Sequence, residues 1–118
     1  MDALGLVASL ISNGKYDLLK IGTTSANYRD SEYTLTASKN FVFALITGVL
    51  GFIDSPSSAS NLCIMVAPNT DVKYCGIPTS SSAYIEFSST ATSVTLDKGY
   101  LEVDNSASGG IITVALFG

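Results

Sequence analysis

Short stretches of β-branched, aromatic and aliphatic residues, each ended by Gly, Pro, Asn, Asp or Ser, recur through most of this sequence of 118 residues. Their length and spacing are typical of β-sandwiches and β-barrels, whose strands are short and joined by tight turns. Within residues 32–37, Tyr33, Leu35 and Ala37 alternate with threonines, which is the pattern of a half-buried strand. The sequence therefore predicts an all-β chain, an antiparallel β-sandwich of jelly-roll type with about eight strands.

Two of the expected strands, residues 41–46 and 111–117, are apolar on both faces. Such strands are typical of the centre of a sheet, where both sides are covered. One side would meet the core, and the other side would meet partner subunits. The composition agrees, because 47% of the residues are apolar and only 14% are charged, which is a surplus of apolar surface for a small chain. The sequence favours an oligomer over the alternative, a tightly packed monomer coated with Ser and Thr.

The first 21 residues allow two interpretations. Asn13-Gly14 lies between two apolar runs, residues 8–12 and 15–21, and this dipeptide favours the type I′ turn of a β-hairpin. In the alternative, residues 3–12 form a short amphipathic helix that Asn13-Gly14 caps. The hairpin is slightly favoured. Residues 22–31 are polar and aperiodic, as expected for a loop or linker.

A second hairpin is expected from residues 62–67 and 71–75, joined by Pro68-Asn69-Thr70. A three-residue loop places Cys63 opposite Cys75, within the distance that a disulfide requires. The N-terminus has no basic residues ahead of its apolar ones, so no secretory signal is expected. We therefore expect both cysteines to stay reduced, as two small apolar fillers on one sheet face.

The charge distribution argues against several classes of partner. The net charge is −4, and the basic residues are scattered without forming a patch, so no nucleic-acid partner is expected. Membrane insertion is not expected either. The most apolar stretch, residues 41–53, is interrupted by Thr47 and two glycines, and it is shorter than the roughly 20 residues of a spanning helix.

The sequence contains no histidine, which removes Ser-His-Asp triads, Cys-His pairs and His-ligated metals within one chain. Carboxylates are the remaining acid/base candidates, since Glu102 and Asp104 would share one strand face, with Asp97 on the adjoining turn. Such a row more often keeps an exposed strand soluble. Neither a calcium-binding loop nor a glycine-rich phosphate loop is present. We expect a non-enzymatic protein without a cofactor or a metal.

One predicted loop holds the best candidate for a receptor-binding cluster, Tyr28-Arg29-Asp30. Tyrosine and arginine contribute much of the binding energy in protein interfaces. In the alternative, Arg29 pairs with Asp30 or Glu32 on a solvated loop. The Ser-rich loops at residues 55–60, 79–82 and 88–92 are expected to be solvated turns, although their hydroxyls would also suit a glycan.

Four segments follow one another within residues 32–118. They are a Tyr-Thr-Leu-Thr-Ala strand at 33–37, the apolar run at 41–46, a Val-Thr-Leu-Asp-Lys-Gly turn at 94–99, and a strand ending in Phe-Gly at 114–118. This order resembles the C-terminal jelly-roll head domains of phage tail fibres and related receptor-binding proteins. The resemblance implies a homotrimer in a virion appendage that contacts the host surface. Residues 1–31 would then be an N-terminal hairpin or neck segment with a linker, or a strand that completes the sandwich.

The expected function is a non-enzymatic virion module, a trimeric tip that attaches to a host-surface glycan or protein and contacts other virion proteins. The alternative is a purely structural capsid decoration or tail-assembly protein. Its location would be the virion, assembled in the host cytoplasm. The doubly apolar strands supply the expected interface between the three subunits: Phe41, Phe43, Ile112, Val114 and Leu116.

Overall fold

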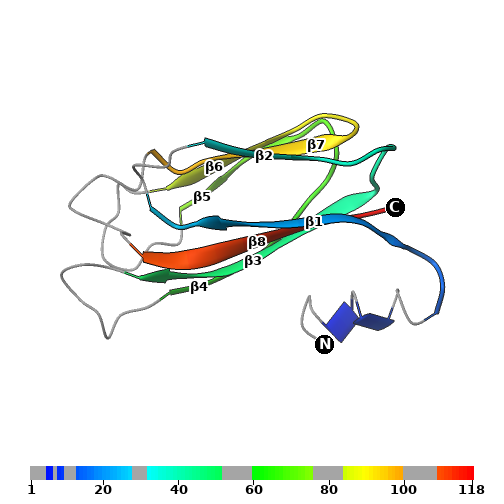
Figure 1. The fold of residues 1–118 in the computed structure, drawn as a ribbon, viewed down its shortest axis with the longest axis horizontal. Coiled ribbons are helices and arrows are strands. Elements are labelled where there is room, and N and C mark those ends of the chain that lie inside the picture. Colours follow the sequence, from blue (N-terminus) through cyan, green and yellow to red (C-terminus); the bar gives the residue numbers. More distant parts are fainter. Residues whose placement is uncertain are drawn as a thin grey trace.

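Eight strands form two antiparallel sheets in the part of the chain that the computed structural model describes, which is residues 5–6, 8–9, 13–27, 32–51, 60–75, 84–99 and 109–118. The sheets stack as two layers (Figure 1). In chain order the strands are β1 (Leu18–Ser25), β2 (Glu32–Thr36), β3 (Phe43–Gly51), β4 (Ser60–Val66), β5 (Asp71–Tyr74), β6 (Ile85–Ser89), β7 (Ser93–Asp97) and β8 (Gly109–Phe117).

We call the two layers sheet A, with strand order β1-β8-β3-β4, and sheet B, with strand order β2-β7-β6-β5. The predicted all-β class and the number of strands are confirmed. The two doubly apolar stretches became β3 and β8, which pair with each other over their full lengths in the middle of sheet A. Their position follows from their sequences, because a strand that is apolar on both faces is stable only where both faces are covered.

The main core fills the space between the sheets. Sheet B contributes Leu35, Phe87 and Leu96, which alternate with outward-facing polar residues as the sequence predicts. Sheet A contributes alternate residues of its two central strands, among them Ile46 and Leu116, and both are fully buried. Gly22 of β1 allows the ring of Tyr33 to lie over it, since a side chain at residue 22 would collide with the tyrosine hydroxyl.

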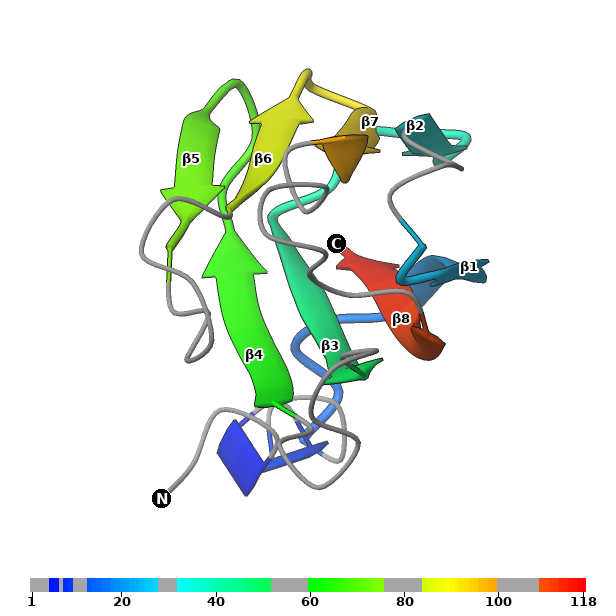
Figure 2. The same cartoon turned by 90° about the vertical axis from the view of Figure 1, so that its left-hand side faces the viewer.

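The hairpin expected between residues 62–67 and 71–75 is wrong. β4 belongs to sheet A and β5 to sheet B, so the turn at residues 68–70 crosses from one layer to the other, as Figure 2 shows. Ser89 of β6 holds this crossing in place. Its hydroxyl donates to the carbonyl of Ala67 (2.6 Å) and accepts from the amide of Thr70 (2.9 Å), and Asn69 turns the chain with a positive φ of 55°.

The N-terminal segment is partly helical. Gly5, Leu6, Ala8 and Ser9 are in helical conformation, so the first strand of the slightly favoured hairpin does not form there, and the helix alternative agrees with these residues. The amide of Asn13 donates to the carbonyl of Ser9 at 3.1 Å, and Gly14 follows with a φ of 72°. A glycine with a positive φ that follows a hydrogen-bonded helical turn is a common C-terminal cap.

β1, which follows the N-terminal helix, completes sheet A. It pairs along its length with β8, from Leu18 opposite Phe117 to Ser25 opposite Ile111. Asp17 extends this ladder, because its backbone exchanges two hydrogen bonds of 3.0 Å with Gly118. Residues 17–25 are therefore part of the sandwich, and the expectation of a loop or linker is wrong for residues 22–25, which pair with β8.

Lys98, directly after β7, is fully buried and joins the two layers. Its Nζ donates to Thr24 Oγ1 (2.8 Å) and to the carbonyl of Ser25 (2.7 Å), both at the end of β1. A buried ammonium is costly unless its protons are bound, and these two acceptors bind two of them. The end of β7 is thereby fixed against the end of β1.

Candidate functional site

The outward side of sheet A carries no charged residue at any described strand position. The register aligns these side chains in rows that run across the four strands. We call this surface the uncharged face. Its rows are Leu18–Phe117–Phe43, Ile21–Ala115–Leu45–Met65, Thr23–Thr113–Thr47–Cys63 and Ser25–Ile111–Val49–Asn61.

Much of the uncharged face is open to solvent. Among the described residues, seven large apolar side chains are exposed, and five of them lie on this face: Leu18, Ile21, Val49, Met65 and Ile111. Ile111 is the most exposed, at 62%. Isolated apolar residues on a surface are ordinary, but several of them on one sheet face, with Ile111 directly opposite Val49, are typical of an interaction surface.

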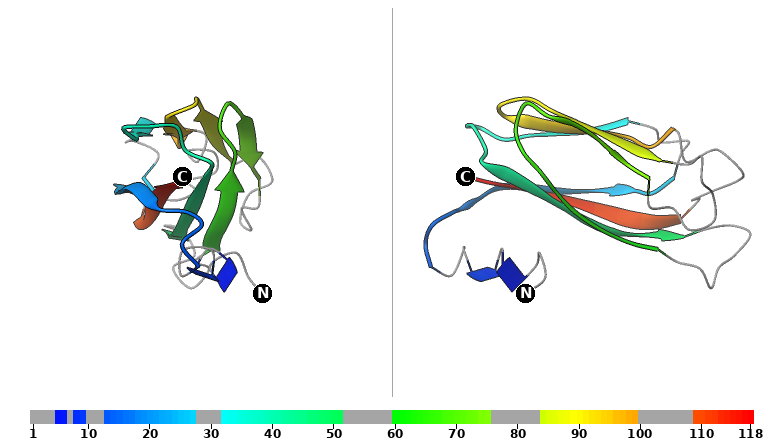
Figure 3. Two further views of the ribbon diagram at one scale, coloured as in Figure 1. Left: turned by 90° about the vertical axis from the view of Figure 1, so that its right-hand side faces the viewer. Right: turned by 180° about the vertical axis from the view of Figure 1, so that it is seen from behind.

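One end of the uncharged face is covered by the protein's own N-terminal segment. Tyr16 packs edge-on against Phe43, with ring centroids 5.3 Å apart, and Phe43 stacks on Phe117 at 5.0 Å. Leu45 and Ala115 complete this second apolar cluster. The helical residues lie on the same side of sheet A (Figures 1 and 3). The open part of the face is therefore its other end, around Ile111.

The outward side of sheet B is polar, and we call it the polar face. Its register also forms rows across the strands, and these rows combine carboxylates, hydroxyls and one lysine. They are Glu32–Asp97–Glu86–Lys73 and Thr34–Thr95–Ser88–Asp71.

Short polar contacts connect neighbouring strands of the polar face. Thr34 and Thr95 share a hydroxyl hydrogen bond of 2.8 Å, and the Ser88 hydroxyl donates to Asp71 at 2.9 Å. Lys73 lies 3.7 Å from Glu86, and their side chains are 58% and 38% exposed, so solvent screens this ion pair and it contributes little stability. The lysine ammonium also lies 4.8 Å from the centre of the Tyr84 ring.

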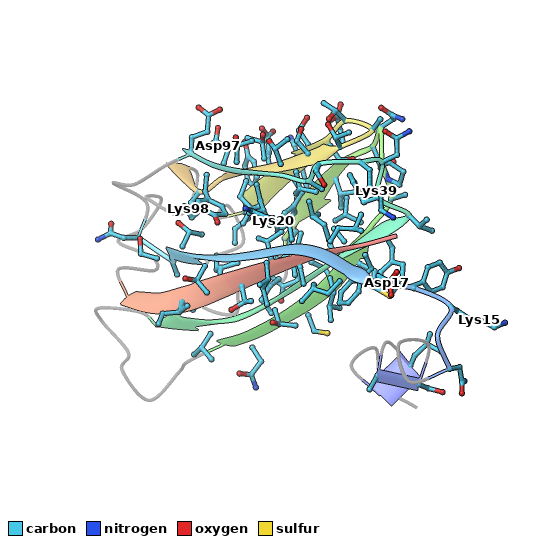
Figure 4. All side chains as sticks on the ribbon, turned by 45° about the vertical axis from the view of Figure 1, so that its right-hand side comes forward. Lys15, Asp17, Lys20, Lys39, Asp97 and Lys98 are labelled. Atoms are coloured by element: carbon cyan, nitrogen blue, oxygen red, sulfur yellow. The ribbon has the colours of Figure 1, made fainter. Side chains whose placement is uncertain are left out.

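A shallow hollow of about 370 Å³ lies on the polar face, lined by Glu32, Glu86, Ser88, Thr95 and Asp97. Figure 4 shows Asp97 on the outer side of sheet B, whereas the adjoining Lys98 is buried. The hollow offers carboxylate acceptors and hydroxyls, which suit hydrogen-bond donors on a polar ligand. Within the described ranges, no group of three or more His, Cys, Asp or Glu residues is arranged to hold a metal ion.

Four of the five residues expected at a subunit interface lie in the core of the single chain. Phe41, Ile112, Val114 and Leu116 are at most 3% exposed and pack between the two sheets. Only Phe43 points to the outer side, where Tyr16 covers its ring. A partner that binds sheet A therefore has to use the opposite side of β8.

Two other sets of candidates lie outside the described residues. The recognition cluster Tyr28-Arg29-Asp30 is one, and the carboxylate pair Glu102 and Asp104 is the other. Asp97, the third carboxylate considered with that pair, lies at the end of β7, and its Oδ1 accepts from the amide of Gly99 at 2.9 Å.

The two cysteines are free, and both are exposed. The register that placed Cys63 opposite Cys75 is wrong, because β4 pairs with β3 in sheet A and β5 pairs with β6 in sheet B. They also do not share a sheet face as two small apolar fillers. Cys63 instead lies on the uncharged face, in the row with Thr47.

Sequence reasoning missed the residues that make the uncharged face open, namely Ile21, Val49, Met65 and Ile111. The signal was partly present, since residues 111–117 are apolar on both sides. A two-residue period separates the odd from the even positions of a strand but does not say which set faces the core. Met65 and Ile21 lie on edge strands, whose places in the sheet were not predictable from local sequence.

No protein-family model, no curated protein and no solved structure matches this chain. In the described part of the chain, no helix is long and apolar enough to cross a membrane.

Proposed function

We propose that this chain is a non-enzymatic virion module, a homotrimeric tail-fibre or receptor-binding tip that attaches to a ligand on the host surface. The observation that carries the proposal is the difference between the two outer faces. One is uncharged and in large part open, and the other is a polar surface of carboxylates and hydroxyls. A module that assembles through one sheet and displays the other needs such a division.

The chemistry of the side chains supports a non-enzymatic role without a cofactor. The whole sequence lacks histidine, the commonest general acid and base. The carboxylates of the polar face stand in a row on an open sheet surface, where they keep the sheet soluble.

Half of the strand pairing supports the jelly-roll type. The last two strands return to the first two, since β8 pairs with β1 and β7 pairs with β2. The pairs β3–β4 and β5–β6 depart from it, because a jelly roll pairs β3 with β6 and β4 with β5.

Attachment to a host-surface glycan or protein would use the polar face and the predicted cluster Tyr28-Arg29-Asp30. The hollow around Asp97 is shallow and open, so a single site would bind weakly. Three copies on one trimer raise the effective concentration of the remaining sites once the first has bound, and overall binding becomes strong enough for attachment.

The experiment has two parts, both made with the full chain. Light scattering should give three times the chain mass of 12.3 kDa. A glycan array and a panel of bacterial cells should then retain the labelled protein, and a Glu86→Gln or Asp97→Asn change should weaken retention. A monomer at high concentration would contradict the trimer. Retention by capsids or tails but not by glycans or cells would favour the alternative, a structural decoration or tail-assembly protein.

A further inference from the structure

We propose that Lys98 is a positioning residue of the receptor site, because it holds the backbone that leads into both parts of that site. The inference rests on the proposed function, in which attachment uses the polar face and the predicted cluster Tyr28-Arg29-Asp30. It adds the residue that joins these two parts. Lys98 acts through its neighbours, since its own side chain is fully buried.

Burying the ammonium of Lys98 costs free energy that an apolar side chain of the same length would not. What the ammonium adds is direction. Its hydrogen bonds to Thr24 Oγ1 (2.8 Å) and to the carbonyl of Ser25 (2.7 Å) fix one arrangement of these groups. In several proteins, buried polar groups select a single arrangement in this way at a cost in stability.

The end of β1 is held from two sides. Lys98 binds residues 24 and 25, and the amide of Ala26, which is fully buried, donates to the carbonyl of Gly110 at 3.0 Å. Successive residues are therefore fixed where the chain leaves sheet A. The predicted cluster begins at residue 28, in the connection that follows.

The other end of the same connection also lies beside Lys98. β2 begins at Glu32, which pairs with Asp97, the residue directly before Lys98. Asp97 Oδ1 accepts from the amide of Gly99 at 2.9 Å, so the backbone around Lys98 is fixed as well. Asp97 and Glu32 both line the hollow of the polar face. Only residues 26–31 join β1 to β2, so the covalent chain keeps the cluster close to this hollow.

The hydrogen bonds of Lys98 set how the two parts of the site stand relative to each other. Without them the sheets would still enclose their apolar core, but the ends of β1 and β7 would be free to shift. The hollow belongs to sheet B and the connection leaves sheet A, so a shift would change the spacing between the two parts. A ligand that contacts both parts binds only the fraction of molecules in the correct arrangement.

The test separates positioning from stability. Lys98→Met/Thr24→Val replaces the ammonium and its hydroxyl acceptor by apolar groups of similar size, so the free energy of unfolding should stay close to that of the parent protein. Retention by bacterial cells that bind the parent should nevertheless weaken about tenfold, as expected if about one tenth of the molecules keep the correct arrangement. Hydrogen exchange at the amides of residues 24–27 should become faster.

Two control variants accompany the double variant. Lys39→Met removes a lysine charge from the exposed turn after β2, which Figure 4 shows toward the opposite end of the sandwich from Lys98, and it should leave retention unchanged. Thr24→Ser keeps a hydroxyl for Lys98 and should also behave like the parent. Should the double variant fail to fold, Thr24→Val against Thr24→Ser makes the same comparison with the lysine in place. Weaker retention of Thr24→Val then supports the role, and equal retention overturns it.

The outcomes separate this inference from the proposed function. A double variant that cells retain as well as the parent would overturn the positioning role and leave the proposed function standing. Unchanged hydrogen exchange, or an equal loss of retention in Lys39→Met, would also overturn the role alone. A parent protein that no glycan or cell retains would overturn the proposed function, and with it the receptor site that Lys98 positions.

Discussion

The inner faces of the two sheets carry the same types of residue, whereas their outer faces carry different ones. Between the sheets, both present alternating Leu, Ile, Val and Phe to one core. On the outside, sheet B presents carboxylates and hydroxyls, whereas sheet A presents Ile, Val, Met, Phe and Thr without a charge at its described strand positions. Folding of a single sandwich needs one apolar face from each sheet. The second apolar face of sheet A is therefore a property that folding alone does not require.

The difference also shows how strands β3 and β8 serve two purposes. Their inner residues, such as Ile46 and Ile112, are fully buried within one chain. Their outer residues are buried at the end that Tyr16 covers and exposed at the other end, where Ile111 and Val49 lie. One pair of strands thus supplies both the core and the uncharged face.

The largest expected effect comes from comparing two neighbours on β8. Ile112→Ala removes a fully buried side chain and leaves a cavity, so the free energy of unfolding should fall by about 2–5 kcal/mol. Ile111→Ala, one residue earlier and 62% exposed, should change it by less than about 0.5 kcal/mol. Urea denaturation of dilute protein measures both. Equal losses would mean that the two sides of β8 are not distinct in solution.

The second effect is on association. Ile111→Lys/Val49→Lys places two charges per copy in the open part of the uncharged face, and repulsion should weaken self-association at least tenfold, equivalent to about 1.4 kcal/mol. Thr34→Lys/Thr95→Lys is the matched control on the polar face. Sedimentation velocity over a range of concentrations gives the constants. If the control weakens association as much, the two faces do not have different roles in association.

The third effect concerns the covered end of the uncharged face. Tyr16→Ala removes the edge-on ring contact with Phe43, and the free energy of unfolding should fall by roughly 1 kcal/mol. Tyr16→Phe keeps the ring and should behave like the unchanged protein. Thermal unfolding at low concentration distinguishes them. An unchanged melting temperature for Tyr16→Ala would show that the Tyr16 ring does not stabilise this end of sheet A.

The smallest effect is expected on the polar face. Glu86→Gln breaks the ion pair with Lys73, and because both side chains are in contact with solvent the free energy of unfolding should fall by at most about 0.5 kcal/mol. Added salt should reduce even this difference, since it screens exposed charges. Urea denaturation at low and high ionic strength is the measurement. A loss above 2 kcal/mol would mean that sheet B depends on its outer face as well.

The strands themselves were predictable from particular residues. Tyr33, Leu35 and Ala37, which alternate with threonines, lie in β2 and its extension. The doubly apolar runs form the central strands β3 and β8. For the candidate site, only its apolar character could be predicted from the sequence. An apolar surface on these strands was expected, but the residues chosen, such as Ile112 and Leu116, are those that face the core. The structure does not describe Tyr28-Arg29-Asp30, so that cluster stays a prediction.

The sequence by itself determined the strand content and the central position of the doubly apolar strands, because residue periodicity and turn chemistry are local. Only the tertiary structure decided that β4 and β5 belong to different sheets, since Ser89, distant in the sequence, holds the crossing between them. It likewise decided which side of β8 is outside. Periodicity gives every strand two equivalent sides, and only packing against the second sheet makes one of them the core.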